Sequence, residues 1–247
     1  MPIDGLATFN TLTQKLLFGK DSPLVINGQI ATIQSLSGTG ALRIGFEFLA
    51  THCPRDVYIP NPTWGNHQTI IKESGLRYIE YPYFNPKTKG LNYEELIRCL
   101  SFAKTGSIVL LHVCAHNPTG VDPTESQWRG IAKVAKERKL LPFFDSAYQG
   151  YASGDVEKDV RSLRIFMEEG LQFLVAQSFA KNFGLYGERI GALHIVCETK
   201  EVKEKVLSQI RLKIRPMYSN PPLHGARIVA TILADPLYTA QWKVFYC

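Results

Sequence analysis

Short apolar runs alternate with longer amphipathic segments along the chain, and this alternation is the strongest constraint on its fold. The runs predict strands and the amphipathic segments predict helices, because a strand buried on both faces reads as a continuous apolar stretch. Strands that alternate with helices form a mostly parallel sheet with helices on both faces, so we expect three layers of an α/β fold. The predicted strands are Gln29–Gln34, Asp56–Ile59, Ser107–Val113, Leu140–Phe144, Leu171–Gln177 and Ile190–Val196, and the predicted helices are Leu42–Ala50, Asn66–Glu73, Thr124–Lys136, Glu201–Arg211 and Leu223–Leu233.

Composition narrows the class of protein. The 247 residues are 45% apolar and 20% charged, which suits one sizeable globular domain. Every apolar stretch is far shorter than the ~20 residues that cross a bilayer, and no leader pattern precedes them, so we expect neither membrane insertion nor secretion. The net charge of +6 comes from scattered lysines and arginines, which suits anionic small molecules at least as well as nucleic acid. Five cysteines without a CxxC pair are typical of a reducing intracellular compartment.

Small, polar or ionisable residues follow five of the predicted strands. The carboxyl ends of parallel strands lie at one edge of a sheet, which is where such folds bind ligands. The segments that reach this edge are Ser35–Gly40, Pro60–Trp64, His116–Gly120, Asp145–Tyr148 and Ser178–Lys181. The sequence therefore predicts an active site there.

The segment Ser37–Gly40 lies between a predicted strand and a predicted helix. Its amides and hydroxyls could hold a phosphate at the positive end of the helix, or it could be a tight turn with a helix cap. A dinucleotide-binding fingerprint is less favoured, because Arg43 stands where the third small residue belongs.

Two ionisable residues follow apolar strands. Asp145 borders a low-dielectric interior, so its carboxylate needs a cationic partner such as a protonated ring nitrogen; the alternative is an Asp that caps a turn. Lys181 is expected near the edge of the sheet, where partial desolvation makes an amine a nucleophile or base; the alternative is a solvated loop lysine. Ser178 and Arg189, which are phosphate-binding residue types, favour the reactive interpretation.

Aromatic and sulfur-containing residues leave alternatives open. Trp64 and Tyr148 could supply a stacking face and a phenol, or could fill the core. His112, Cys114 and His116 have the spacing of one strand face, but no further ligand completes a zinc site by spacing. A buried histidine that supports the active site is the better interpretation of one of them.

A lysine, an aspartate and a cup of Gly, Ser and Arg residues are what pyridoxal phosphate requires of a protein. Six ordered motifs resemble those of aspartate aminotransferases, which are fold-type I pyridoxal-phosphate enzymes. The motifs are Ser37–Arg43, Asn61–His67, His116–Pro123, Phe144–Gly150, Ser178–Arg189 and Arg215–Pro222. The resemblance implies a three-layer αβα domain with a mostly parallel mixed sheet over residues 1–237, the large cofactor-binding domain, followed by a divergent tail over 238–247.

The resemblance also implies roles for the reactive residues. Lys181 would form the Schiff base with the cofactor and then move the proton from the substrate's Cα. Asp145 would keep the pyridine nitrogen protonated, with His67 orienting Asp145. Asn117 and Tyr148 would hydrogen-bond the phenolic oxygen of the cofactor ring.

The remaining implied roles concern binding. Trp64 would stack on the ring and, with Asn117, contact the substrate. Arg215 would reach into the neighbouring subunit of a homodimer and pair with the substrate's side-chain carboxylate. The phosphate would be held by Ser37, Gly38, Thr39, Ser178 and Arg189.

The implied reaction moves the amino group of aspartate to 2-oxoglutarate and gives oxaloacetate and glutamate. An aromatic-amino-acid aminotransferase shares the same motifs and is the alternative enzyme. The family's N-terminal arm and small domain, including the arginine for the substrate's α-carboxylate, are expected to be missing. That deficit motivates a third hypothesis, a non-catalytic chain that dimerises with a full-length subunit. The compartment is left open between cytoplasm and mitochondrion, with neither nucleic acid nor membrane as a partner.

Overall fold

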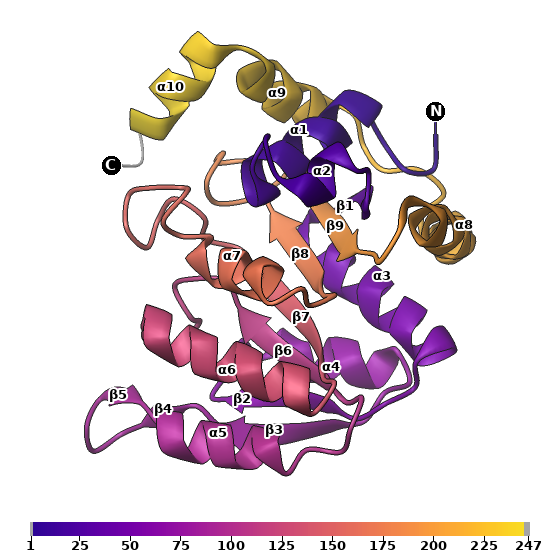
Figure 1. The fold of residues 1–247 in the computed structure, drawn as a ribbon. Helices are drawn as coiled ribbons and strands as arrows, with labels where there is room; N and C mark the ends of the chain where they lie inside the picture. The colour runs from indigo at the N-terminus through magenta and orange to yellow at the C-terminus, as the bar shows by residue number, and fades with distance from the viewer. Residues whose placement is uncertain (1, 245–247) are drawn as a thin grey trace.

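A seven-stranded sheet forms the centre of the structure, a computed structural model that describes residues 2–244 (Figure 1). Its strands run in the order β1-β9-β8-β7-β6-β2-β3. They are β1 (Ile30–Leu36), β2 (Val57–Asn61), β3 (Tyr78–Pro82), β6 (Ile108–His112), β7 (Leu141–Ser146), β8 (Leu174–Ser178) and β9 (Ile190–Val196). A separate short hairpin pairs β4 (Phe84–Asn85) with β5 (Gly90–Leu91).

One strand of the main sheet runs against the others. β9 pairs antiparallel with both β1 and β8, whereas β8, β7, β6, β2 and β3 pair in parallel. The sheet is therefore mixed and mostly parallel, as predicted. The five strands that precede the predicted site segments share one direction, so their carboxyl ends lie at the same edge.

Helices cover both faces of the sheet and complete three layers (Figure 1). One face carries α3 (Ser37–His52), α4 (Asn66–Glu73) and α8 (Lys200–Met217), and the other carries α5 (Tyr93–Ser101), α6 (Glu125–Glu137) and α7 (Arg161–Glu168). Near the β1–β9 end lie α1 (Ala7–Phe18), α2 (Pro23–Ile26), α9 (His224–Ala234) and α10 (Pro236–Val244). Every helix within residues 2–244 is too short or too polar to span a bilayer.

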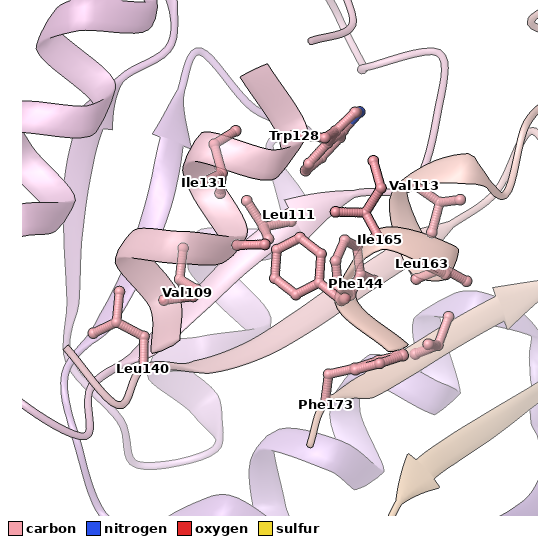
Figure 2. Packing of buried hydrophobic residues seen from close by; sticks show 14 of the residues in the cluster. Val109, Leu111, Val113, Trp128, Ile131, Leu140, Phe144, Leu163, Ile165 and Phe173 are labelled. Atoms are coloured by element: carbon pink, nitrogen blue, oxygen red, sulfur yellow. The ribbon is translucent and has the colours of Figure 1, made fainter. Parts of the chain in front are cut away.

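Alternating side chains of the buried strands build a separate core on each face. Along β6, Val109 and Leu111 pack towards α6 and α7, while Ile108 and Leu110 pack towards α3. Phe144 of β7 lies at the centre of the first core (Figure 2). Its ring centroid is 5.0 Å from that of Phe166 and 5.6 Å from that of Phe173.

We expect Phe144→Ala to lower the free energy of unfolding by about 3–5 kcal/mol, because it leaves a cavity among aromatic side chains. Phe102→Ala is the matched control, since that ring is 83% exposed and its removal should change stability by less than about 0.5 kcal/mol. Urea unfolding of the two variants measures the difference. Equal midpoints would contradict this description of the core.

Several elements differ from the sequence prediction. β3 was not predicted, because its half-exposed residues and Pro82 do not form a continuous apolar run. α3 begins at Ser37 rather than Leu42, so the Gly-containing segment is the first turn of the helix. α10 continues through the predicted boundary at residue 237, and residues 245–247 of the predicted tail lie outside the described residues.

Candidate active site

A cavity of about 410 Å³ lies at the carboxyl edge of the sheet. It is lined by ten of the residues to which the resemblance gives a role and by six others, of which His112 and Cys114 belong to the zinc alternative. The ten are Ser37, Gly38, Thr39, Trp64, Asn117, Asp145, Tyr148, Ser178, Lys181 and Arg189; the six are Leu42, His112, Cys114, Ala147, Ala180 and Tyr186. The sheet therefore brings together segments that are up to about 150 residues apart in the chain.

Lys181 lies against an aromatic ring inside this cavity. Its Nζ is 3.9 Å from the centroid of the Tyr148 ring, a cation–π arrangement that holds the amine at the edge of the sheet. The Tyr148 hydroxyl in turn accepts a hydrogen bond of 3.4 Å from Asn117 Nδ2. The amine, the phenol and the amide thus form one cluster.

Asp145 ends a chain of hydrogen bonds whose direction is fixed by a backbone amide. The Asn117 N–H donates to His112 Nδ1 at 3.2 Å, so the neutral His112 ring carries its proton on Nε2. That nitrogen lies 3.4 Å from Thr63 Oγ1 and can donate to it, which leaves the Thr63 hydroxyl proton for His67 Nδ1 at 2.8 Å.

The last step of this chain reaches the carboxylate. With Nδ1 as an acceptor, His67 donates from Nε2 to Asp145 Oδ2 at 3.0 Å. Asp145 Oδ2 is therefore the acceptor at the end of this chain. Its Oδ1 makes no hydrogen bond to any other described residue, so it can accept from a protonated group in the cavity.

Stacked imidazole rings form the wall behind this chain. The His116 ring lies between Tyr83, at a centroid distance of 3.8 Å, and His112, at 4.3 Å. Burial, with a smaller contribution from the nearby His67, lowers the pKa of His116 to about 3. Burial also lowers the pKa of His112 well below its ordinary value, and the neighbouring His116 and His67 add to this effect.

These depressed pKa values predict how stability depends on pH. Between about pH 6.5 and pH 3 the unfolded chain binds a proton at His116 that the folded protein does not. Stability is therefore complete above pH 6.5 and falls as the pH is lowered, by about 1.4 kcal/mol per pH unit for each such histidine. Denaturant unfolding at several pH values between 7 and 5 gives the slope of the free energy of unfolding against pH. This slope should be smaller in His116→Phe than in the unmodified chain, and unchanged in a variant of the exposed His52. Equal slopes in all three proteins would contradict the buried neutral stack.

Backbone contacts shape a polar cup at the other side of the cavity. Ser37 Oγ lies 3.0 Å from Ser178 Oγ, and the Ser37 N–H donates to the Arg189 carbonyl at 3.1 Å. Both Ser37 and Arg189 have positive φ angles, 62° and 54°, which turns their main chains sharply at this point. A Cβ built on Gly38 would lie 3.1 Å from Ser178 Cβ, so a side chain there would fill the cup.

Arg215 is one of two predicted site residues that do not line the cavity. It is exposed near the end of α8, where its Nη1 donates to Ser219 Oγ at 2.6 Å. His67 also lies outside the cavity lining and acts only through Asp145.

Two residues of the site were given no role from the sequence, although a local sequence pattern indicated each of them. Thr63 lies just before α4, four residues ahead of His67 in its first turn. This spacing brings the Thr63 hydroxyl next to the imidazole ring of His67. Gly191 is a glycine inside the apolar strand β9, which often marks a close approach of two backbones. Within residues 2–244, no three His, Cys, Asp or Glu side chains are grouped as metal ligands.

Comparison with known proteins gives the family. The protein-family model for aminotransferase class I and II matches residues 1–244. The chain belongs to this family. A cytoplasmic aspartate aminotransferase of Oryza sativa subsp. japonica is 56% identical over 245 residues, which are 99% of this chain and 60% of the rice protein. This aminotransferase chain thus spans about 60% of the length of the curated relatives it matches.

Solved structures agree with the assignment. A mitochondrial aspartate aminotransferase from Trypanosoma brucei superposes with a TM-score of 0.97 at 46% identity, over 99% of this chain and 65% of the other. An aromatic-amino-acid aminotransferase from Burkholderia pseudomallei, described as covalently bound to pyridoxal phosphate, gives 0.97 at 44% identity over 100% of this chain and 62% of the other. The aminotransferase fold is therefore reproduced over the whole described chain.

Proposed function

We propose that this chain is the cofactor-binding domain of an aspartate aminotransferase and that its cavity binds pyridoxal phosphate. The observation that carries the proposal is the meeting in one cavity of an amine, Lys181, a carboxylate, Asp145, and a hydroxyl-lined cup. Lys181 and Arg189 are the cations among the described lining residues and Asp145 is the acid, so the cavity favours an anionic ligand.

The donor set fits a phosphate group. Ser37 and Ser178 offer hydroxyls, Arg189 offers a guanidinium, and the first turn of α3 presents backbone N–H groups at its positive end. Gly38 keeps the cup open, as its contact with Ser178 indicates. We infer that Ser37, Gly38, Thr39, Ser178 and Arg189 hold the phosphate.

A glycine next to the cup provides a test. A Cβ on Gly191 would lie 2.5 Å from the Ser37 carbonyl carbon and 2.5 Å from the Gln177 oxygen. We expect Gly191→Ala to displace Ser37 and to weaken pyridoxal-phosphate binding about tenfold, as judged by titration. Gly187→Ala is the control, because nothing lies within 4 Å of its Cβ position. Equal affinities of the two variants would argue against Ser37 as a phosphate ligand.

The carboxylate serves the ring of the cofactor. When bound, pyridoxal phosphate supplies a protonated ring that delocalises the electron pair left at the substrate's Cα. Asp145 Oδ1 would be the acceptor that favours a proton on the ring nitrogen, and the chain from the Asn117 N–H through His67 ends in a hydrogen bond to Asp145 Oδ2. Trp64 contributes an aromatic face to the same cavity.

Lys181 serves the covalent and proton-transfer steps. Its amine is the nucleophile available to a carbonyl carbon in this cavity, and once free it takes the proton from the substrate's Cα. Tyr148 lies beside Lys181, and Asn117 Nδ2 donates to the Tyr148 hydroxyl. These two side chains would hydrogen-bond the phenolic oxygen of the ring. Asn117 and Trp64, which line the same cavity, would also contact the substrate.

Substrate recognition involves a second copy of the chain. A dicarboxylic amino acid needs a cationic fork for its side chain, and Arg215 lies outside the cavity of its own chain. We infer a homodimer in which Arg215 binds the side-chain carboxylate of aspartate or glutamate in the neighbouring site. Residues 1–237 form the cofactor-binding domain in this proposal, and the compartment is intracellular, as for the cytoplasmic rice relative.

The experiment that tests the proposal measures glutamate formed from 2-oxoglutarate, with aspartate or phenylalanine as donor, by the chain loaded with pyridoxal phosphate. We expect faster turnover with aspartate. Faster turnover with phenylalanine would favour the aromatic-amino-acid alternative. No turnover by the loaded chain alone, with dimerisation to a full-length subunit, would favour a non-catalytic partner.

A further inference from the structure

Ser219 adopts a backbone conformation that normally favours glycine. It lies just beyond the end of α8, where its φ is 65°. The N–H groups of Tyr218 and Ser219 both donate to the Ile214 carbonyl, at 3.1 and 3.2 Å, which closes the last turn. Glycine is the usual residue at this left-handed position, because a Cβ is strained there. A serine at this strained position suggests that its side chain has a function that glycine could not supply.

The hydroxyl of Ser219 is fully engaged. It donates to Asn220 Oδ1 at 3.0 Å, so its lone pairs are left to accept from Arg215 Nη1 at 2.6 Å. The Arg215 guanidinium is thus held by a neutral oxygen. Within residues 2–244, no carboxylate lies within ion-pair distance of Arg215, so its positive charge is not compensated.

The loop that carries Ser219 is itself fixed to the body of the domain. The buried Gln34 of β1 donates from Nε2 to the Pro222 carbonyl at 2.6 Å, and the Tyr218 hydroxyl donates to the Gln34 carbonyl at 3.4 Å. One turn before Arg215, Arg211 forms a bidentate pair with Asp4 at 2.7 and 2.6 Å. The hydroxyl therefore has a fixed position relative to the sheet.

We propose that Ser219 is a positioning residue that fixes the Arg215 guanidinium for the second carboxylate of a dicarboxylate substrate. This inference rests on the proposed function of Arg215. A long side chain loses rotamer freedom when it binds a ligand, and a side chain that is already ordered loses less. Ser219 thus contributes to dicarboxylate affinity although it is assigned no contact with the substrate.

Two variants separate positioning from a structural role. Ser219→Ala and Ser219→Gly both remove the hydroxyl, but only alanine keeps the strained Cβ. Succinate is the dicarboxylate probe and 3-phenylpropionate the monocarboxylate control, each titrated into the chain loaded with pyridoxal phosphate. We expect both variants to bind succinate about fivefold more weakly and 3-phenylpropionate unchanged. Ser219→Gly should also unfold at a higher temperature than Ser219→Ala.

The outcomes are distinguishable. If Ser219 acts only on the fold, Ser219→Gly will bind succinate like the unmodified chain, which overturns the inference. Arg215→Ala should weaken succinate binding by at least about twentyfold. If it does not, the role proposed for Arg215 fails, and the inference about Ser219 fails with it. NMR relaxation of the Arg215 Nε–Hε group, without ligand, should show an ordered side chain that becomes mobile in both Ser219 variants; mobility in the unmodified chain would also overturn the inference.

Discussion

Lys181→Ala is expected to abolish covalent binding of pyridoxal phosphate. The chain mixed with the cofactor should lose the visible absorbance band of the Schiff base, because that band appears only when the cofactor's carbonyl carbon is joined to an amine. Transfer of amino groups should fall below detection, since the same amine takes the proton from the substrate's Cα. Absorption spectra and an amino-transfer assay measure the two losses.

A second lysine variant controls for the loss of a positive charge. Lys133 lies on α6 with its side chain 76% exposed and pairs only loosely with Glu137 at 3.9 Å. Lys133→Ala should keep the visible band and the activity of the unmodified chain. A band of full intensity in Lys181→Ala would contradict the assignment of this lysine.

Asp145→Asn is expected to slow amino transfer by about 10²–10³-fold, the cost typical of removing one preorganised electrostatic group from an active site. The His67 Nε2–H is a donor and lies 3.0 Å from Oδ2, so the new amide must present its oxygen to His67. The NH₂ group of the new asparagine then faces the cavity. It is a hydrogen-bond donor at the place where Oδ1 of the carboxylate was an acceptor. A donor at this place disfavours a proton on the ring nitrogen.

Single-turnover measurements with aspartate test this effect. The exposed Asp21 gives the control variant Asp21→Asn, which should react like the unmodified chain. Binding of pyridoxal phosphate to Asp145→Asn should persist, because Lys181 and the phosphate cup are unchanged. A rate within tenfold of the unmodified chain would mean that Asp145 does not control protonation of the ring.

The sheet and most of the cavity lining were predictable from the sequence. Buried parallel strands are continuous apolar runs, so residues that follow them, such as Asp145 and Lys181, can be placed at one edge without knowing strand order. The mixed direction of β9 was expected only through the resemblance to known aminotransferases. The edge strand β3 was missed, because a half-exposed strand lacks both an apolar run and a clean alternation.

The details of the site depended on three-dimensional contacts that no local pattern reveals. The direction of the chain from Asn117 to Asp145 follows from a backbone N–H that faces His112, and only folding creates that contact. The sequence spacing of Cys and His residues was enough to argue against a zinc site at His112. The role of His112 as a buried, neutral link in the hydrogen-bond chain could be seen only from the folded structure. The same holds for Ser219, whose left-handed backbone cannot be read from its residue type.

Peptide mapping of the borohydride-reduced chain is the most direct test of the claim that this cavity binds pyridoxal phosphate through Lys181. The unmodified chain is mixed with the cofactor, reduced, digested and analysed by mass spectrometry. We predict a single reduced adduct, on the peptide that contains Lys181. An adduct on other lysines, or no adduct at all, would contradict the account.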